Sequence, residues 1–396
     1  MKGRFAIVGY GETEVSRGRI DKGEARLSLK EYVASAMKLA LEDAGIEKKD
    51  LENQGFGITG SAYPHAEIYS GEVIQDLGIS PKLVIRADTG GNSGATLLSQ
   101  AGIAVSSGVV DIVLCVGADT PMNITYPGAV REWRYEADFQ KPFGMMGPNS
   151  QFAFIMRRHM HQYGTKLEDI GKVSVSQREN ASKNKNAYLK TPITIEQYLN
   201  SRLIADPVKL LDACIQVNGG LAFLVVSEDY ASKLPKDKVV WVKGIAEYHN
   251  YRHGSSLSPD ITYTGIAVSA REAFKIAGIE HNDVDLLQIY DDYALAVIMQ
   301  IEDLGFCQKG EGGKFVAEHD ITYKGDIPIN TGGGQLSAGQ PGMAGGMLHI
   351  VEGVRQLRGE GEQRQVSRAE TCVVTALGCL EYNNTFAHTS TIVLGV

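Results

Sequence analysis

The chain has 396 residues, of which 43% are hydrophobic, and a formal net charge of −8. Its length is sufficient for two fused domains with a large core. The acidic balance argues against a nucleic-acid partner, which normally requires a basic surface. No apolar run reaches the roughly 20 residues of a membrane span, and the N-terminus lacks the apolar core of a signal peptide. The cysteines are scattered and form no metal-binding pair (Cys115, Cys214, Cys307, Cys372 and Cys379). We therefore expect a cytoplasmic α/β protein with no bound metal, no nucleic-acid partner and no membrane partner.

The first part of the chain alternates between apolar strands and amphipathic helices. We predict, in order, a strand at 5–10, a helix at 28–44 that stops at Gly45, a strand at 56–60, a helix at 93–107 and a strand at 111–117. The helix at 93–107 is so rich in alanine, glycine and serine that it should be buried, with other backbone packed closely against it. The alternation favours a mostly parallel sheet covered on both faces.

The composition changes between Thr120 and about Asp212, where aromatic residues, methionine, arginine and lysine become common. The stretch 178–190 (RENASKNKNAYLK) is polar and basic. We interpret the whole segment as an insert that covers the site rather than as part of the sheet. A mobile basic cover in an acidic protein suits an anionic ligand such as a nucleotide phosphate. For any single lysine, the alternative is an ordinary solvated surface.

The second part of the chain repeats the plan of the first. The segments ALEDAGIEKKD (40–50) and AFKIAGIEHND (273–283) are nearly the same, and each lies upstream of a Gly-rich corner. After the insert we predict strands at 221–227, 239–245, 285–290, 372–377 and 389–395, and helices at 267–277, 294–304 and 347–357. A duplicated fold usually forms its site where the halves meet. We therefore expect one half at 1–240, with the insert at about 120–212, a second half at 241–396, and a pocket that both corners face.

The two corners supply polar groups that do not titrate. In the first corner, Gly90–Gly94, Gly91 lies at the tip of a turn that opens a helix. Free N–H groups and the positive end of the helix dipole point there and can stabilise an oxyanion. Ser93 is the nearest hydroxyl, but serine at a helix start is far more often an N-cap than a nucleophile. In the second corner, Asn330–Gly342, Gln340 can hydrogen-bond a carbonyl oxygen through its amide.

The predicted strand at 285–290 ends in two tyrosines and two carboxylates (Tyr290-Asp291-Asp292-Tyr293). In open α/β sheets, ligands bind at the carboxyl ends of the strands. We expect one aspartate to cap the next helix and Tyr293 to pack in the core. Tyr290 is the better functional candidate, because a phenol whose neighbours lower its pKa from about 10 can act as a general acid or base.

These features combine into a resemblance that covers essentially the whole chain. The helix start Ser93-Gly94 with the strand DIVLCVGAD (111–119), the motif NTGGGQLSAGQPG (330–342) and the cover region 163–214 resemble blocks of the thiolase superfamily. The stretch RQLRGEGEQRQV (355–366) is typical of thiolase-like lipid-transfer proteins. The resemblance implies the thiolase fold, an α/β fold of two duplicated βαβαβαββ halves in five layers (αβαβα) with an inserted loop domain.

Conventional thiolases acylate a cysteine and also use a histidine and an asparagine. Here Gly91–Gly94 occupies the block that carries the catalytic cysteine in those enzymes, and Gln340 replaces the histidine. Tyr290 aligns with the asparagine, and Cys379 is offset from the position of a second cysteine. The covalent thiolase mechanism is therefore not expected.

Tyr290-Asp291 and the segment 335–342 are instead similar to the thiolase-like aldolases that shorten steroid side chains. Ala344 stands where a second tyrosine would be expected in those enzymes. They cleave a β-hydroxyacyl-CoA without an acyl-enzyme and work with a small OB-fold, zinc-ribbon partner. The resemblance thus implies a homodimer that carries two such partner subunits.

The first hypothesis is an aldolase-type carbon–carbon lyase that acts on an acyl-CoA. Tyr290 would take the proton of the β-hydroxyl, with Asp291 tuning or orienting it. Backbone N–H groups near Gly91 or Gly333, together with the Gln340 amide, would hold the thioester oxygen. Coenzyme A would be part of the substrate, with no other tightly bound cofactor. The residues expected to hold it are Met146, Arg178, Lys183, Lys185 and Ser337.

Two other functions remain open. One is an acyltransferase that uses another nucleophile, either Cys379 or an external thiol. The other is a non-catalytic acyl-CoA- or lipid-binding subunit that needs its partner for any chemistry.

Overall fold

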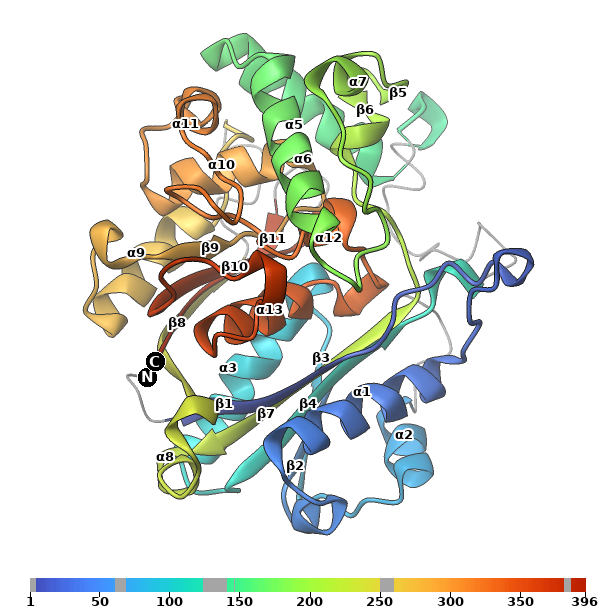
Figure 1. Ribbon diagram of the computed structural model, residues 1–396, viewed down its shortest axis with the longest axis vertical. Coiled ribbons are helices and arrows are strands. Elements are labelled where there is room, and N and C mark those ends of the chain that lie inside the picture. The colour runs from blue at the N-terminus through green and yellow to red at the C-terminus, as the bar shows by residue number, and fades with distance from the viewer. Residues whose placement is uncertain (1–4, 61–68, 124–140, 146, 250–259, 381–385) are drawn as a thin grey trace.

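The computed structural model describes residues 5–60, 69–123, 141–145, 147–249, 260–380 and 386–396 (Figure 1). Within these residues the main sheet has the strand order β3-β2-β4-β7-β1-β8-β11-β10-β9. The strands are β1 (Phe5–Glu12), β2 (Gly55–Thr59), β3 (Leu83–Ala87), β4 (Ile112–Asp119), β7 (Gly219–Ser227), β8 (Val240–His249), β9 (Leu286–Gln288), β10 (Thr371–Leu380) and β11 (Phe386–Gly395).

The sheet contains the same four-strand arrangement twice. In the order β2-β4-β7-β1 the first pair is parallel and the next two pairs are antiparallel. The order β9-β10-β11-β8 has the same sequence of directions. The two arrangements join where Ala6 pairs with Trp241 and Ile7 pairs with Val240. The near-repeat in the sequence therefore corresponds to a duplication of the fold.

The expectation of a mostly parallel sheet was wrong. Among the described strands, only β2 with β3, β2 with β4 and β9 with β10 pair in parallel. A helical crossover returns the chain in the same direction, which gives these pairs. By contrast, β10 and β11 follow one another along the chain as antiparallel neighbours, and β7 runs antiparallel to both β1 and β4.

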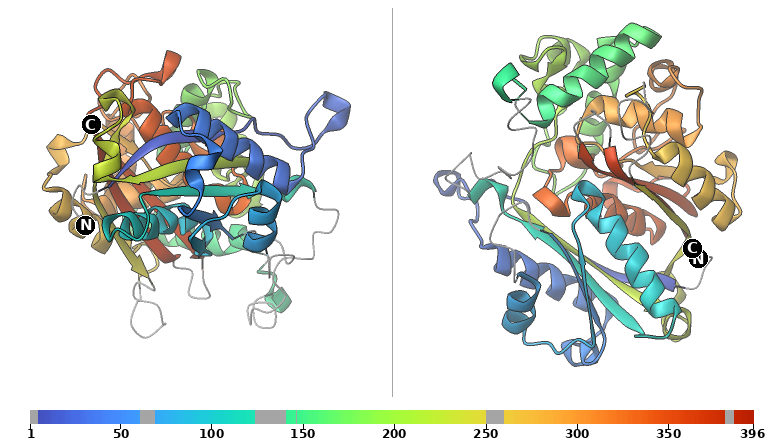
Figure 2. Two further views of the ribbon diagram at one scale, coloured as in Figure 1. Left: turned by 90° about the horizontal axis from the view of Figure 1, so that it is seen from below. Right: turned by 180° about the vertical axis from the view of Figure 1, so that it is seen from behind.

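The helices and the sheet form five layers (Figures 1 and 2). The outer helices α1 (Leu29–Ala44) and α2 (Tyr69–Leu77) cover one half of the sheet, and α9 (Ile266–Ala277) and α10 (Ala294–Leu304) cover the other. The helices α3 (Ser93–Ser106) and α13 (Met347–Leu357) lie between the two halves and share one apolar core. The thiolase-type layering implied by the resemblance is confirmed.

Local chemistry explains where the best-predicted helices begin and end. The helix α1 starts at a capping box between Ser28 and Glu31 and stops at Gly45, which is left-handed with φ of 66°. In α3, a Cβ at Gly94 would lie 2.7 Å from Met347 Cγ in α13. The small residues of α3 therefore allow the two central helices to approach closely, as expected for a buried helix.

The described part of the insert stays outside the main sheet. It contains α5 (Pro148–Tyr163), α6 (Leu167–Ser182), α7 (Ile195–Leu199) and a separate pair of strands, β5 (Leu203–Ala205) and β6 (Val208–Lys209). The helix α6 packs against α10, α11 (Gly312–Glu318) and α12 (Gly334–Ser337) of the second half. The remaining short helix, α8 (Glu228–Ala231), follows β7. None of the helices in the described residues is long and apolar enough to cross a membrane.

Candidate functional site

Tyr290 lies just past the carboxyl end of β9 and is only 4% exposed. Its backbone is fixed on both sides: its N–H donates to Thr375 Oγ1 (3.2 Å), and its carbonyl accepts from Gln300 Nε2 (2.7 Å). The phenol is therefore held by β10 and α10 at the centre of the molecule. This is the strand-end position that the sequence predicted.

The Tyr290 side chain fills the space beside Gly91. A Cβ at position 91 would overlap the Tyr290 hydroxyl oxygen and its ring carbon Cζ, and would lie 2.6 Å from the carbonyl oxygen of Leu377. A Cβ at Gly346 would in turn overlap the carbonyl oxygen of Gly91. The structure thus brings two of the predicted catalytic residues, from opposite halves, into direct contact and leaves no room for a side chain at position 91.

Ser93 closes the turn that carries Gly91. Its Oγ donates to the Gly90 carbonyl (2.7 Å) and accepts from the Thr89 N–H (2.9 Å). Ser93 is fully buried and is the first residue of α3, whose N-cap position is Asn92. The prediction that Ser93 is the N-cap was therefore wrong, because Asn92 holds that position. The Ser93 side chain is nevertheless used to hold the turn, as was expected in preference to a role as nucleophile.

Asp291 caps a helix, but not the one predicted. Its carboxylate accepts the N–H groups of Gln335 (2.9 Å) and Leu336 (3.2 Å) at the start of α12, and lies 3.1 Å from His349 Nε2. The next helix along the chain, α10, has Tyr293 at its N-cap position and no side-chain cap. Burial raises the pKa of Asp291, and His349 acts in the opposite direction. Both oxygens of this carboxylate are thus committed to holding α12.

Asp292 has a different environment from its neighbour. The residue is half-buried, and its buried Oδ1 has no hydrogen-bond partner among the described residues. Its backbone carbonyl accepts from the Cys214 N–H (2.9 Å). Burial and the Asp291 charge raise the pKa of Asp292 to about 7. The sequence presented two equivalent aspartates, whereas the fold has made one a cap and has left the other with one oxygen that has no hydrogen-bond partner among the described residues.

Burial also determines the protonation of the tyrosines. It raises the pKa of Tyr290 well above 10, the Asp292 charge adds to the rise, and the Gln335 amide acts in the opposite direction. The sequence-based hypothesis made Tyr290 an acid–base catalyst only if its neighbours lower its pKa, and in the structure the pKa is raised. Tyr293 packs in the core as predicted, stacked on Phe152 with ring centroids 4.2 Å apart. At neutral pH Tyr290 is a protonated hydrogen-bond donor.

Two buried residues complete the cluster and were missed from the sequence. His349 of α13 lies with its Nε2 3.3 Å from Gln335 Nε2, and its ring centroid is 6.0 Å from that of Tyr290. Both His349 and Gln335 are at most 1% exposed. In the sequence, His349 stands out only as an ionisable residue on the apolar face of a helix. Such a residue is more often a buried side chain with its hydrogen bonds made inside the core than part of a site.

Gln340 and Gly333 are already hydrogen-bonded within their own corner. The Gln340 amide donates to the Gly342 carbonyl (3.0 Å) and accepts its N–H (3.2 Å). Gly333, at φ of 98°, precedes α12 and donates its N–H to the Asn330 carbonyl (2.8 Å). A thioester oxygen bound by either group would have to displace these partners.

The residues expected to hold coenzyme A do not form one cluster. Arg178 of α6 donates through Nε to Ser337 Oγ (3.0 Å) at the end of α12, and both residues are buried. Burial lowers the pKa of Arg178. Lys185 is exposed and pairs with Glu362 (2.6 Å), whereas Lys183 lies at the C-cap of α6. Met146 lies outside the described residues.

Lys185 lines a groove of about 950 Å³ between the end of β1, α1, the segment 184–191 and the end of α13. A void of about 10 Å³ shares Asn184 and Arg355 with this groove and is also lined by His349. The groove and the void therefore share two lining residues, and the void borders His349 beside the Tyr290 cluster.

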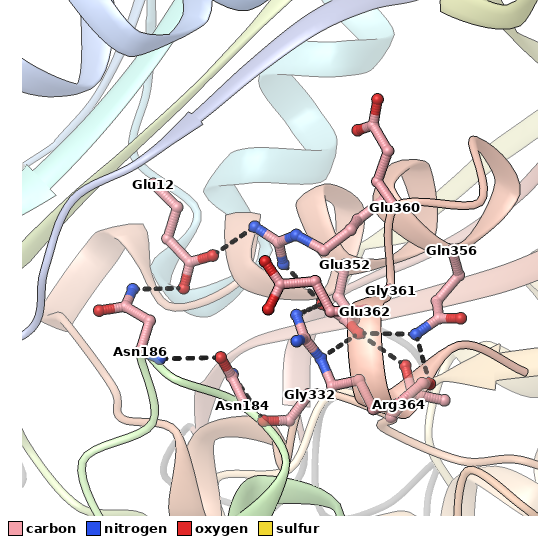
Figure 3. Close-up of polar contacts among 12 residues, drawn as sticks. Glu12, Asn184, Asn186, Gly332, Glu352, Gln356, Glu360, Gly361, Glu362 and Arg364 are labelled. Atoms are coloured by element: carbon pink, nitrogen blue, oxygen red, sulfur yellow. Dashed lines mark hydrogen bonds and ion pairs between the residues drawn. The ribbon is translucent and has the colours of Figure 1, made fainter.

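A buried polar network anchors the second Gly-rich corner (Figure 3). Glu352 accepts from Arg364 (3.0 Å), Arg355 (2.6 Å) and Thr331 Oγ1 (2.8 Å). These cations lower the pKa of Glu352 to about 2, against the effect of its burial. The network continues beyond Glu352, because Arg355 and Asn186 both donate to Glu12. The Asn186 N–H in turn donates to the Asn184 side chain, which donates to the Gly332 carbonyl.

Two cysteines border the cluster. A Cβ at Gly90 would lie 2.9 Å from Cys379 Sγ, and Cys379 itself has a positive φ of 53°. Cys214 lies beside Asp292, and burial raises the pKa of its thiol. Cys379 is thus the thiol adjacent to the first corner.

Comparisons with known proteins agree with this architecture. The family model described as thiolase C-terminal domain-like matches residues 246–395. The chain is 33% identical to acetyl-CoA acetyltransferase of Methanothermobacter thermautotrophicus, over 94% of this chain and 96% of that protein. It is 34% identical to 17-hydroxy-3-oxo-4-pregnene-20-carboxyl-CoA lyase of Mycobacterium tuberculosis, over 95% and 97% of the two chains.

Among solved structures, the Ltp2-ChsH2(DUF35) aldolase superposes with a TM-score of 0.86 at 31% identity, covering 100% of this chain and 98% of that one. Relatives above 30% identity thus span nearly the full length of both proteins, and the duplicated five-layer architecture is shared. This chain belongs to the thiolase superfamily.

Proposed function

We propose that this chain is an aldolase-type lyase that cleaves a β-hydroxyacyl-CoA into a ketone or aldehyde and a shorter acyl-CoA. The observation that carries the proposal is the Tyr290 hydroxyl in the space beside Gly91, where a nucleophilic side chain would otherwise stand. A phenol at that point offers acid–base chemistry instead of acylation. The similarity to proteins named as an aldolase and as a carboxyl-CoA lyase supports this choice.

The reaction requires one proton transfer in each direction and the cleavage of one carbon–carbon bond. The β-hydroxyl proton moves to the Tyr290 oxygen while the phenol passes its own proton on to Cα as the carbon–carbon bond breaks, so that Tyr290 is neutral before and after the reaction. The Cα–Cβ electron pair then moves into the thioester to form an enolate, and Cβ becomes a carbonyl carbon. Cα finally takes a proton, which yields the shorter acyl-CoA. A site that stabilises the enolate lowers the barrier to the cleavage step.

The remaining residues have supporting roles in this proposal. Backbone N–H groups at the Gly91 corner hold the thioester oxygen, with the N–H of Gly333 and the Gln340 amide as further donors once their internal partners are displaced. Asp291 orients the Tyr290 segment by capping α12. The cover binds coenzyme A, with Lys183 and Lys185 near its phosphates.

The assembly we propose is a homodimer with small OB-fold, zinc-ribbon partner subunits. Its support is the similar aldolase structure Ltp2-ChsH2(DUF35), whose name includes a second component. This chain would then supply the lyase site, and the partner would extend the acyl-binding surface.

A second candidate function is acyl transfer through Cys379. It is favoured by the position of Cys379 Sγ next to Gly90 and by the similarity to a protein named acetyl-CoA acetyltransferase. Intact-protein mass spectrometry after mixing with acetyl-CoA tests it: an acetyl adduct that is lost in Cys379→Ser would favour transfer, and an unmodified chain would exclude it.

The lyase is tested by a product screen. The chain, co-expressed with a genomically adjacent OB-fold zinc-ribbon protein if one is encoded, is supplied with a panel of branched β-hydroxyacyl-CoAs. We expect a carbonyl product together with a shortened acyl-CoA, and loss of both products in Tyr290→Phe with retention of acyl-CoA binding. Cleavage by the Tyr290→Phe variant would contradict the assignment. Binding across the panel without any product would instead indicate a non-catalytic acyl-CoA-binding subunit.

A further inference from the structure

We infer that three buried side chains, Asn330, Thr375 and Gln300, are positioning residues that hold the Tyr290 phenol in its place beside Gly91. This inference rests on the proposed lyase function and identifies the groups that fix its acid–base residue. Each of the three side chains is fully buried and is hydrogen-bonded to the backbone of the segment that carries Tyr290. Because they act on that backbone, they place the reacting phenol and do not themselves exchange protons with a substrate.

The regular pairing of β9 ends two residues before Tyr290. Its last pair with β10 is Gln288 with Val374. Beyond that point, the backbone N–H and carbonyl groups of Ile289 and Tyr290 all bond to side chains. Buried backbone groups need such partners wherever no neighbouring strand supplies them. The position of Tyr290 therefore depends on the identity of the side chains that take over from the sheet.

Asn330 takes the place of a strand residue next to Ile289. The segment before it pairs with β9, since the Leu287 N–H donates to the Pro328 carbonyl (2.9 Å) and the Asn330 N–H donates to the Leu287 carbonyl (3.0 Å). At Asn330 the backbone turns into the left-handed region, with φ of 50°, which asparagine tolerates better than most residues. Its side-chain amide then accepts the Ile289 N–H (2.7 Å) and donates to the Ile289 carbonyl (2.8 Å). A carboxamide has the donor and the acceptor of a peptide group, so it continues the pairing by one residue.

Thr375 and Gln300 close a ring of hydrogen bonds around Tyr290. The Tyr290 N–H donates to Thr375 Oγ1 (3.2 Å), and the Thr375 hydroxyl donates to Gln300 Oε1 (2.7 Å). Gln300 Nε2 donates in turn to the Tyr290 carbonyl (2.7 Å), and also to the Ala296 carbonyl (2.8 Å) of its own helix. The ring thus holds the peptide groups on both sides of the Tyr290 Cα. It therefore fixes the direction in which the Tyr290 side chain leaves the backbone.

The proposed chemistry gives a reason for this rigid arrangement. A displacement of a reacting group by about 1 Å can lower a rate roughly 10²-fold. The contact with Gly91 limits the Tyr290 ring at its hydroxyl end, and the ring of hydrogen bonds fixes its backbone end. The Asn330 carbonyl also accepts the Gly333 N–H (2.8 Å). Asn330 is therefore bonded both to the Tyr290 segment and to the second corner, and it sets the phenol and the corner in one fixed relation.

The kinetic test compares two variants of Thr375 on the substrate that gives the best cleavage in the product screen. Thr375→Val keeps the shape of the side chain but breaks the ring of hydrogen bonds, and it should lower kcat by roughly 10²-fold with little change in KM. Thr375→Ser keeps the hydroxyl and should retain most of the rate. A wild-type kcat in Thr375→Val, or equal losses of kcat in Thr375→Val and Thr375→Ser, would overturn the inference.

Thr391 provides the matched control. It lies directly opposite Thr375 in the pairing of β10 with β11, is equally buried, and its hydroxyl oxygen is 2.9 Å from Ser269 Oγ. Thr391→Val therefore removes a similar buried hydrogen bond that does not involve Tyr290. It should lower the melting temperature to a similar extent as Thr375→Val but leave kcat unchanged. Equal losses of kcat in Thr375→Val and Thr391→Val would reflect a general loss of stability and would contradict a positioning role.

A spectroscopic test needs no substrate. Fluorotyrosine introduced at position 290 should give a narrow ¹⁹F signal in the otherwise unchanged chain. The signal should broaden in Thr375→Val and in Gln300→Met, which breaks the ring of hydrogen bonds at its other side. With the label moved to Tyr32, a buried residue of α1 in a separate apolar core, the signal should stay the same in both variants.

The two tests separate the inference from the proposed function. An unchanged ¹⁹F signal at position 290 in either variant would overturn the positioning role whether or not the protein cleaves any substrate. If the signal broadens in both variants but the wild type cleaves nothing, the lyase function fails while the positioning of the Tyr290 phenol stands. If the wild type cleaves its substrate and Thr375→Val keeps the full kcat, the lyase function stands and the positioning role fails.

Discussion

At the scale of single residues, the site depends on the absence of a side chain at position 91. The Tyr290 phenol occupies the volume that any Cβ there would need, so the hydroxyl is positioned by contact as well as by its backbone hydrogen bonds. The φ of Gly91 lies outside the left-handed region, so alanine fits the backbone conformation and the conflict is purely steric.

Gly91→Ala should therefore abolish cleavage by displacing the Tyr290 ring. Gly91→Ala combined with Tyr290→Phe should not relieve the destabilisation, because the clash also involves ring carbon Cζ. Gly91→Ala combined with Tyr290→Ala should relieve only the part of it that comes from the ring, because the new Cβ would still lie 2.6 Å from the carbonyl oxygen of Leu377. Thermal unfolding of the three variants, with product formation measured in parallel, provides the test. Full activity of Gly91→Ala would show that the phenol does not act from this position.

The raised pKa of Asp292 also affects stability. Its value of about 7 in the folded chain exceeds the unfolded reference of 3.8, so between these pH values the folded state holds a proton that the unfolded state has released. Its contribution to the free energy of unfolding therefore decreases as pH rises from about 4 to 7. Asp292→Asn should be more stable than the wild type at pH 8, by at most a few kcal/mol, and the difference should shrink at pH 4. Urea unfolding at the two pH values measures this, and a variant less stable at pH 8 would contradict it.

The sequence was informative about some of these residues and uninformative about others. Position at a strand end and in a Gly-rich turn was enough to identify Tyr290 and Gly91 as site candidates. Asp291 and Asp292 are adjacent, and nothing local shows that one reaches α12, which lies far along the chain. From the sequence, an acid–base role for Tyr290 was conditional on a lowered pKa, but burial raises the pKa, and burial depends on packing between distant segments.

At the scale of secondary-structure elements, two short segments organise the site. The helix α12 has only four residues, yet it contacts Asp291 at its start and Arg178 through Ser337 at its end. Its sequence, GQLS, has no helical periodicity, and its stability comes from these tertiary contacts. The longer helices α1, α3, α10 and α13 were predictable because each presents an apolar face over several turns.

The network around Glu352 should be the main electrostatic support of the second corner. Glu352→Ala leaves the buried Arg364 without its carboxylate partner and leaves Arg355 with Glu12 alone, which should cost about 3–5 kcal/mol of unfolding free energy at pH 7. The matched control is Glu362→Ala, which removes the exposed pair with Lys185 and should cost less than about 1 kcal/mol.

The pH dependence of this contribution has the opposite sign to that of Asp292. The pKa of Glu352 is lowered from 4.5 to about 2, so its stabilisation is fully present above pH 4.5 and is lost as pH falls through 2. The difference in unfolding free energy between the wild type and Glu352→Gln should therefore become smaller as the pH falls towards 2. If Glu352→Ala and Glu362→Ala lose the same amount of unfolding free energy at pH 7, the stabilising role of the network would be contradicted.

The basic cover should act on binding rather than on stability. Lys185 is exposed and forms a surface pair, so Lys185→Ala should leave the melting temperature nearly unchanged while raising KM for acyl-CoA several-fold at low salt. Lys49→Ala, which removes an exposed pair with Glu47 next to α1, is the control. An unchanged KM in Lys185→Ala would place coenzyme A elsewhere on the cover.

At the scale of the whole molecule, duplication positions the site. Each half contributes one corner and one central helix, and Tyr290 from the second half meets Gly91 from the first. The near-repeat at 40–50 and 273–283 was sufficient to predict this relation. The directions of the strands were not predictable, because they depend on how each connection crosses the sheet rather than on local periodicity.

One edge of the main sheet, formed by β3, is where we propose that two copies of the chain associate. The strand β3 is terminal in the strand order, and Val84 within it is 46% exposed. Exposed edges with apolar side chains favour pairing with another chain. Native mass spectrometry should therefore give twice the 42.9-kDa chain mass, increased by small subunits when the partner is co-expressed. A single-chain mass under both conditions would contradict this assembly.

The most direct test of the proposed lyase is the fate of the α-carbon. Cleavage of a β-hydroxyacyl-CoA in D₂O should yield a carbonyl product and a shortened acyl-CoA in equal amounts, the latter with one deuterium at Cα, because the enolate is protonated by an exchangeable group. Mass spectrometry of the acyl-CoA reads this directly, and both products should be lost in Tyr290→Phe. A shortened acyl-CoA without deuterium, or release of free coenzyme A with the acyl chain intact, would contradict a retro-aldol cleavage at Tyr290.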